Sequence, residues 1–258
     1  KLYEVVKLLE PYAKSSERIP RMVRGGVYQS KFLRDFSLSE DITKFFSEIT
    51  NLELQPHTIP HQLGHINYNP LKKGINIDKW HTDTLRYDYV LFVTDPNKVV
   101  GGEFEYFLGT KKQIEKIHAK GVKIPSKKII SIKPPAPGYA IFLHGNMVVH
   151  RAKGIVSDGE RITLVNGYVA KDMVKNPDFT NFEESYLTEP KHVGTSEFAK
   201  HTALIAREHL NRCINDVEFS EDREKYIKEL DSTSKILTEA IKKIKKVGIK
   251  AKSKHFGD

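Results

Sequence analysis

The sequence has little cysteine: Cys213 is the only one among 258 residues. A single cysteine excludes an intrachain disulfide and a cysteine-based zinc site, and it fits a reducing compartment. No run of 18 apolar residues is present, and the first residues lack the profile of a signal peptide. We therefore expect no membrane span and a cytoplasmic protein.

Acidic residues are absent between Ile241 and Lys254, a stretch that holds seven lysines. Subtracting these lysines from the formal net charge of +9 leaves about +2, so the rest of the chain is nearly neutral. A lysine-rich tail can attract phosphate or acidic lipid. This tail has no arginine and no interleaved aromatic residues on which bases would stack. We expect a solvated helix end and no nucleic-acid partner; a lysine-driven nucleic-acid or lipid-binding module is the alternative.

The composition, 39% hydrophobic and 10% aromatic, is that of a globular protein with a sizeable core. Apolar residues recur at helical spacing from Leu2 to Leu9, and again after Ser39, which has the character of a helix cap. Eight short segments of strand character follow, separated by turn residues. They are residues 64–69, 76–83, 86–94, 103–108, 129–133, 138–144, 147–152 and 161–169.

Eight strands with only one short helix between them, at residues 111–120, predict an antiparallel double sheet. Two helical stretches come later, one at residues 196–215 and one beginning at the Ser220 cap, and they predict a hairpin that packs on the sheets or supplies a homodimer contact. The predicted fold is therefore α+β, mainly β: a jelly-roll core with N-terminal flanking helices and a C-terminal helical hairpin. The expected divisions are a helical flank at 1–60, the core at 61–172 and a C-terminal region with the Lys-rich tail at 173–258.

A His-x-Asp pair, His81 and Asp83, precedes a long apolar run, and His150 and Arg161 follow it. Residues two apart on a strand project from the same face and can share one ion, whereas a helix would place them about 200° apart. Two imidazoles and one carboxylate can hold ferrous iron on one face and leave the other coordination positions free. The alternative is a polar pair at the end of a strand.

The region from about 60 to 170 resembles the superfamily of iron(II)- and 2-oxoglutarate-dependent oxygenases, with features of its prolyl-hydroxylase-like and phytanoyl-hydroxylase-like double-stranded β-helix members. The resemblance lies in six short motifs: Tyr68-Asn-Pro, Trp80-His-Thr-Asp83, Gly101-Gly-Glu-Phe, Pro137-Gly138, His150 and Arg161-Ile-Thr163. It implies iron(II) bound by His81, Asp83 and His150, with 2-oxoglutarate and O2 as co-substrates and ascorbate as an optional reductant.

Two histidines compete for the distal ligand position, His144 and His150. Relatives place the basic residue for the far carboxylate of 2-oxoglutarate shortly after the distal histidine. Arg161 is 11 positions after His150 and 17 after His144, so we choose His150.

Arg161 begins an apolar segment, where a guanidinium needs an anionic partner, and its planar fork suits a carboxylate. Thr163 lies on the same strand face, and the pair resembles the arginine-x-serine/threonine arrangement that binds 2-oxoglutarate. Tyr68 resembles a tyrosine that reaches the same co-substrate in some relatives, although the branch it suggests usually has lysine where this chain has Arg161. The alternative for Arg161 is a salt bridge to a nearby acid, either Glu103, Glu105 or Asp158.

The resemblance implies a dioxygenase that couples oxidative decarboxylation of 2-oxoglutarate to hydroxylation or a related C–H oxidation. Related halogenases have a small residue at the position of Asp83, so that halide can bind the iron. Asp83 therefore predicts hydroxylation and not chlorination.

The substrate is less defined by the sequence. Trp80, Arg86 and Tyr87 flank the iron pair and are expected to face the substrate, with packing of the strand as the alternative for Tyr87. We expect a small polar metabolite, such as an amino-acid-like or natural-product intermediate. The alternatives are an oxygenase acting on a protein or peptide side chain and a non-catalytic cupin-like or anionic-ligand-binding module.

Overall fold

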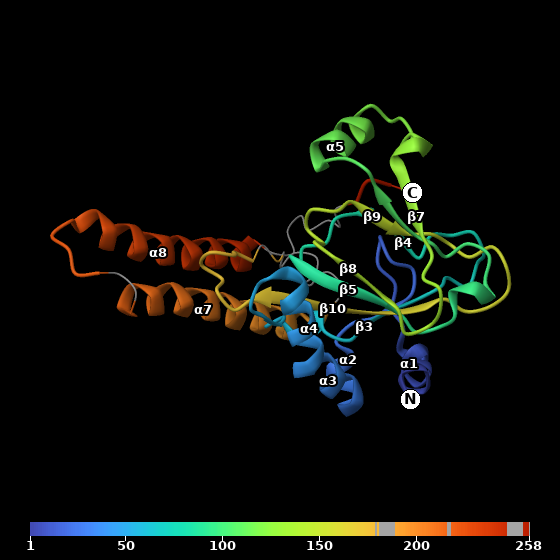
Figure 1. Cartoon of the computed structure of the whole chain (residues 1–258), viewed down its shortest axis with the longest axis horizontal. Helices are drawn as coiled ribbons and strands as arrows, with labels where there is room; N and C mark the ends of the chain where they lie inside the picture. Colours follow the sequence, from blue (N-terminus) through green and yellow to red (C-terminus); the bar gives the residue numbers. More distant parts are fainter. Residues whose placement is uncertain (179, 181–188, 216–217, 247–254, 258) are drawn as a thin grey trace.

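The computed structural model describes residues 1–178, 180, 189–215, 218–246 and 255–257. Two antiparallel sheets form the body (Figure 1). One has the strand order β1-β3-β10-β5-β8, with β2 also paired to β10, and the other has the order β4-β9-β6-β7. The strands are β1 (Met22–Val23), β2 (Leu54–Pro56), β3 (His65–Tyr68), β4 (Asp78–His81), β5 (Tyr87–Phe92), β6 (Phe104–Phe107), β7 (Ile129–Ile132), β8 (Ala140–Leu143), β9 (His150–Ala152) and β10 (Ile162–Ala170).

Helices flank the sheets at the N-terminal side and form a hairpin at the C-terminal side. They are α1 (Leu2–Leu9), α2 (Gly26–Gln29), α3 (Lys31–Ser37), α4 (Glu40–Thr50), α5 (Lys111–Ala119), α7 (Lys191–Asn215) and α8 (Arg223–Lys246). Ser39 caps α4 by accepting a hydrogen bond from the Ile42 N–H. The predicted fold class, a two-sheet jelly-roll core with N-terminal helices and a C-terminal helical hairpin, is confirmed.

Successive side chains along each strand point to opposite faces of the six-stranded sheet. Ile162 and Leu164 of β10 join an apolar cluster with residues of α1, α3 and α4. Thr163 and Val165, the alternate residues of the same strand, line a cavity between the sheets. The helices thus cover the outer face of this sheet and leave its inner face for the cavity.

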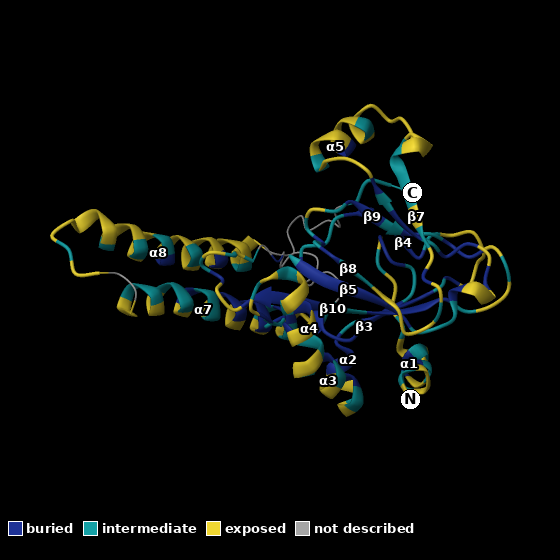
Figure 2. Ribbon diagram, viewed as in Figure 1, coloured by how far each residue is buried: buried dark blue, intermediate teal, exposed yellow. Residues whose placement is uncertain are grey.

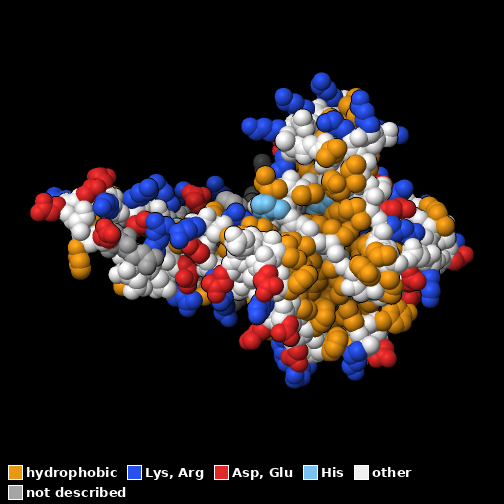
Figure 3. Space-filling model, in the orientation of Figure 1, with side chains coloured by type: hydrophobic (Ala, Val, Ile, Leu, Met, Phe, Trp, Pro, Cys, Tyr) orange, Lys and Arg blue, Asp and Glu red, His pale blue; other side chains and the backbone are white. Residues whose placement is uncertain are grey.

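The α7–α8 hairpin projects from the body, and much of its surface is exposed (Figures 1 and 2). On the face shown in Figure 3, Lys and Arg side chains gather around α5. Three of the tail lysines, at 250, 252 and 254, lie outside the described residues. Within the described ranges, no helix is long and apolar enough to cross a membrane.

Candidate metal centre

Strands β4 and β9 bring two histidines together. His81 and His150 are direct partners in the register of this antiparallel pair, and their ring centroids lie 4.3 Å apart. Asp83 follows β4, and its backbone N–H donates to the Gly145 carbonyl. Its carboxylate lies between the rings, with Oδ1 3.3 Å from His81 Nε2 and Oδ2 3.2 Å from His150 Nε2. The structure therefore places all three predicted ligands around one point.

Backbone carbonyls determine which nitrogen of each imidazole faces that point. His81 Nδ1 donates to the Lys79 carbonyl at 2.6 Å, and His150 Nδ1 donates to the Val148 carbonyl at 3.0 Å. A carbonyl only accepts, so the ring proton of a neutral imidazole lies on Nδ1 and the Nε2 lone pair is left for a ligand. With both rings neutral, two Nε2 lone pairs and a carboxylate face one another with no proton between them, which is the arrangement that a cation stabilises.

The three side chains also shift each other's protonation. Burial alone would raise the pKa of Asp83, but His150 and His81 hold it well below its usual range. Burial alone would lower the pKa of His150, but the Asp83 carboxylate raises it. The site thus favours an ionised carboxylate, a metal ligand at neutral pH.

Arg161 lies directly before β10 on the cavity wall, with 1% of its surface exposed. Its Nε donates to the Gly102 carbonyl at 3.1 Å and its Nη1 to Thr163 Oγ1 at 3.0 Å. Gly102 permits this approach, because a Cβ there would lie 3.2 Å from Arg161 Cγ. Nη2 has no hydrogen-bond partner among the described residues. Burial lowers the pKa of Arg161 to about 10.

The salt-bridge alternative for Arg161 is wrong, because each acid considered pairs with another cation. Glu103 lies 3.6 Å from Lys153, Glu105 lies 2.7 Å from Arg151, and Asp158 lies 2.7 Å from Lys73. In the described part of the chain, no carboxylate lies within ion-pair distance of Arg161. The guanidinium is therefore held in place by neutral groups and is left without an anion.

Two predicted site residues point away from the cavity. Tyr68 donates from its hydroxyl to the Val6 carbonyl at 2.7 Å and packs in the apolar cluster beneath the helices. Its neighbour Asn67 faces the cavity instead. Trp80 packs with Phe107 and Ile114 on the other side of β4. The predictions that Tyr68 reaches the co-substrate and that Trp80 faces the substrate are corrected, because side chains alternate along a strand.

Arg86 and Tyr87 also lie outside the cavity lining. Arg86 donates to the Tyr87 hydroxyl and to the Pro177 carbonyl. Tyr87 stacks on His144, the rejected candidate for the distal ligand, with 5.0 Å between the ring centroids. Arg86 and Tyr87 thus lie outside the lining of the cavity that holds His81, Asp83 and His150, and their contact with a substrate stays a prediction. His144 stacks on Tyr87 and is not part of that three-residue group.

The cavity wall contains charged residues that the sequence analysis missed. Arg18 and Arg24 precede α2, and Asp88 lies within β5. Asp88 is fully buried, and neither of its carboxylate oxygens has a hydrogen-bond donor among the described residues. Burial raises the pKa of Asp88 well above its usual range, and the nearby Asp83 raises it further. The sequence signal that could have revealed Asp88 is an acidic residue within an apolar strand, two positions before Val90 and thus on the same face.

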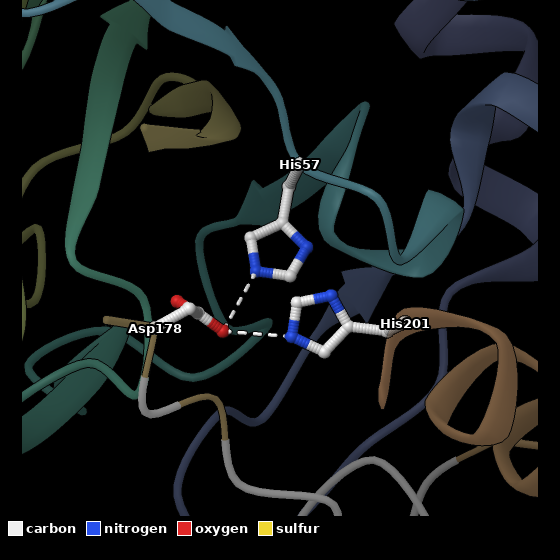
Figure 4. A group of neighbouring side chains, drawn as sticks. All are labelled: His57, Asp178 and His201. Carbon is white, nitrogen blue, oxygen red and sulfur yellow. Dashed lines mark hydrogen bonds and ion pairs between the residues drawn. The ribbon is translucent and has the colours of Figure 1, made fainter. Parts of the chain in front are cut away.

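A second group of two histidines and one aspartate lies where α7 meets the body (Figure 4). His201 Nε2 of α7 is 2.9 Å from Asp178 Oδ2, and His57 Nε2 is 3.7 Å from the same oxygen. All three side chains are buried. Burial would raise the pKa of Asp178, but His201 and His57 lower it far below its usual range.

Backbone hydrogen bonding distinguishes this group from the first one. His57 Nδ1 accepts a hydrogen bond from the Ile59 N–H, so the proton of a neutral His57 lies on Nε2, the nitrogen nearest Asp178. Nε2 also lies 2.8 Å from Thr180 Oγ1. A metal at this nitrogen would have to displace that proton from a ring whose other nitrogen already accepts. In the group of His57, Asp178 and His201, a ring nitrogen next to the carboxylate therefore carries a proton. In the group of His81, Asp83 and His150, both ring nitrogens next to the carboxylate have lone pairs that can bind a metal.

Comparisons with known proteins find one family model and several solved structures that are similar to this chain. A family model described as Halogenase D matches residues 13–186. Among solved structures, the chain is similar to SnoN, a non-heme α-ketoglutarate-dependent epimerase from nogalamycin biosynthesis, with 13% identity, a TM-score of 0.47 and coverage of 66% of this chain and 71% of that one. HygX from Streptomyces hygroscopicus, solved with nickel and 2-oxoglutarate, has 12% identity, a TM-score of 0.43 and coverage of 65% and 76%. A Pseudomonas putida prolyl-4-hydroxylase has 12% identity, a TM-score of 0.40 and coverage of 65% and 82%. A search of curated protein sequences finds no match.

Proposed function

The chain belongs to the Halogenase D family, and from this premise we propose that it is an iron(II)- and 2-oxoglutarate-dependent dioxygenase that hydroxylates a small polar substrate. The observation that carries this proposal is the convergence of His81 Nε2, His150 Nε2 and the Asp83 carboxylate in a buried cavity. Two imidazoles and one carboxylate on one face of an ion are the ligand set of non-haem iron(II) oxygenases.

Each group in the proposed site has a distinct role. His81, Asp83 and His150 hold the iron, which with 2-oxoglutarate and O2 supplies the oxidising chemistry for a C–H bond. Arg161 binds the far carboxylate of 2-oxoglutarate, because among the described residues its buried guanidinium has no partner for Nη2 and no ion-paired carboxylate. Thr163 holds Nη1 and keeps the fork oriented toward the cavity. Phe92, against which the guanidinium lies at 4.7 Å, adds a cation–π contact.

The carboxylate of Asp83 favours hydroxylation over halogenation, despite the family's name. A halide needs a coordination position on the iron, and the resemblance places a small residue at this point in halogenases. Here a carboxylate lies within 3.3 Å of both imidazole nitrogens and would occupy that position when iron is bound. The protein would therefore not leave a coordination position on the iron open for chloride in the way that a small residue at position 83 would.

The charges on the cavity wall support a small substrate that carries charges of its own. Arg18 lies 3.4 Å from Asp78 and Arg24 lies 3.9 Å from Glu189, so charged pairs line this wall, and Asp88 is a buried carboxyl group with no hydrogen-bond donor among the described residues. A small molecule with an anionic group and a hydrogen-bonding polar group, as in an amino acid, would find partners for both there. Most of the lining side chains are buried, which favours such a metabolite over a polypeptide.

The test is a screen of amino acids and related metabolites with the iron(II)-loaded protein, scored by succinate release. Active mixtures are repeated under 18O2 with excess chloride, and the products are analysed by mass spectrometry. We expect a product that contains one oxygen atom from O2 and no chlorine, and no succinate from Asp83→Ala. A chlorinated product would contradict the role given to Asp83. Binding of 2-oxoglutarate without any succinate would favour a non-catalytic binding module.

A further inference from the structure

The C-terminal hairpin carries an apolar surface that nothing in the described chain covers. On α7, Leu210 is 41% exposed and Ile214 is 76% exposed. On α8, four large aliphatic residues are each at least 41% exposed: Ile227, Leu230, Leu237 and Ile241. Isolated exposed apolar residues are ordinary, but a continuous strip of them on a projecting element marks an interaction surface.

The α8 residues form one stripe. Successive helical residues are about 100° apart, so Ile227, Leu230, Leu237 and Ile241 project within a sector of about 80°. Their spacing of three, seven and four residues is the spacing of a helix that packs along another helix. Thr233 and Ala240, the buried residues of α8, lie roughly a quarter turn behind this stripe. The stripe is therefore distinct from the surface that α8 buries.

The two helices present their stripes on the same side of the hairpin. They run antiparallel, because Phe198 near the start of α7 packs with Ala240 near the end of α8. Leu210 and Ile214 lie about two-fifths of a turn ahead of the residues that α7 buries, in the same rotational sense as on α8. In an antiparallel pair, the same sense of rotation leads both stripes to one face, defined here as the hairpin face: Leu210, Ile214, Ile227, Leu230, Leu237 and Ile241.

The hairpin has too small a core to account for its length. Its apolar cluster contains Phe198 and Ala240, with Ile244 packed against them, all at the end near the body. Farther out, α8 buries only Thr233, and Arg212 of α7 lies 3.7 Å from Glu229. Helices in water depend on tertiary packing of an apolar face for most of their stability. A second layer on the hairpin face would supply that packing.

We propose that the hairpin face binds the hairpin face of a second copy of this chain, so that two hairpins form an antiparallel four-helix bundle. Helices of 25 and 24 residues, at 1.5 Å per residue and about 10 Å in diameter, give a face of roughly 700 Å². This is close to the area of about 800 Å² per partner in a standard specific interface. An isologous two-fold contact of this kind is closed, so assembly stops at the dimer.

Charge favours the antiparallel arrangement of the two copies of α8. The C-terminal end of α8 carries four lysines, at 242, 243, 245 and 246, whereas its N-terminal end mixes Glu221, Asp222 and Glu224 with Arg223 and Lys225. A two-fold axis perpendicular to the helices places the basic end of one copy beside the mixed-charge end of the other. A parallel pairing would place four lysines against four lysines, which costs energy.

The test measures the mass of the full-length chain in solution by light scattering and sedimentation equilibrium. We expect twice the chain mass of 29.5 kDa. Leu230→Asn with Leu237→Asn should shift the dissociation constant at least about 100-fold toward the monomer. The matched control, Lys228→Asn with Lys235→Asn, changes exposed residues outside the stripe and should remain dimeric. Both pairs replace exposed side chains, and circular dichroism checks that α8 is intact.

The orientation is tested separately with Cys213, the only cysteine, as a site for one spin label per chain. Cys213 is about ten residues from the middle of α7, so antiparallel pairing separates the two labels by about 30 Å along the bundle. Parallel pairing would bring them much closer and would overturn the proposed axis. A monomeric wild-type chain, or a dimer that survives the double leucine substitution, would overturn the proposal itself. Neither outcome depends on the proposed reaction.

Discussion

At the scale of single residues, Arg161 is expected to lower the stability of the folded chain and to strengthen the binding of 2-oxoglutarate. Its guanidinium is buried, and one of its nitrogens has no partner in the described part of the chain, which is costly to the folded state. We expect Arg161→Met to leave the free energy of unfolding unchanged or raised without 2-oxoglutarate, and to weaken 2-oxoglutarate binding by about 10- to 100-fold. Chemical denaturation and anaerobic calorimetry measure the two effects.

The matched control for Arg161 is Arg151→Met. Arg151 is also an arginine of low exposure, but it pairs with Glu105 at 2.7 Å and lies over the Trp80 ring. Its replacement should destabilise the fold, because Glu105 would lose its partner, and should leave the affinity for 2-oxoglutarate nearly unchanged. The proposed role of Arg161 fails if both variants bind 2-oxoglutarate as the wild type does.

The two histidine–aspartate groups differ in the proton on one nitrogen, and this difference predicts the metal content. His81 and His150 both donate from Nδ1, whereas His57 accepts there. We expect one iron(II) per chain after anaerobic reconstitution, measured by elemental analysis. Asp83→Ala should lose it and Asp178→Asn should retain it. Two equivalents in the wild type, with one lost in each variant, would show that the second group also binds metal.

At the scale of elements, α7 is attached to the body through charge. His61, in the short turn after β2, has Nδ1 2.9 Å from Glu197 of α7 and Nε2 3.3 Å from Glu189. Burial alone would lower the pKa of His61, but the two carboxylates raise it to about 9. Because the folded pKa exceeds the unfolded one, this contact stabilises the fold fully below the unfolded pKa of 6.5.

That stabilisation is lost as the pH rises through 9, and it amounts to about 3 kcal/mol at most. We therefore expect the free energy of unfolding to fall between pH 7 and pH 10 in the wild type. His61→Gln should be less stable at pH 7 and should lack this part of the slope. Urea unfolding across the range measures both, and equal slopes in the two proteins would contradict the role of His61.

The strands and the His81–Asp83 pair were predictable from sequence because a period of two residues determines both, whereas His150 was chosen by its spacing from Arg161. All eight predicted strands are present, whereas β1 and β2 were missed because two or three residues are too few to show a period. The same period explains the errors at Tyr68 and Trp80, whose immediate neighbours Asn67 and His81 face the cavity. Arg18 and Arg24 reach the cavity from an irregular segment, which no local pattern reveals.

At the scale of the whole molecule, the end of the chain returns to the candidate metal centre. The Phe256 N–H donates to the Trp80 carbonyl at 2.6 Å, and the Trp80 N–H donates to the Gly257 carbonyl at 3.0 Å. Phe256 also packs on the cluster that contains Trp80 and Ile114. Residues 255–257 therefore pair with the outer edge of β4, next to His81, although the lysine-rich stretch before them suggested only a solvated end.

Removal of the chain after Lys246 should therefore affect the iron site as well as the tail. The truncated protein loses two backbone hydrogen bonds and the packing of Phe256, about 2 to 4 kcal/mol together. We expect a lower free energy of unfolding and weaker retention of iron(II), measured by denaturation and competition with a chelator. Phe256→Ala in the full chain should reproduce part of both losses, whereas Lys242→Gln with Lys243→Gln should reproduce neither. If the truncated protein keeps the stability and iron affinity of the full chain, β4 does not depend on the C-terminal residues.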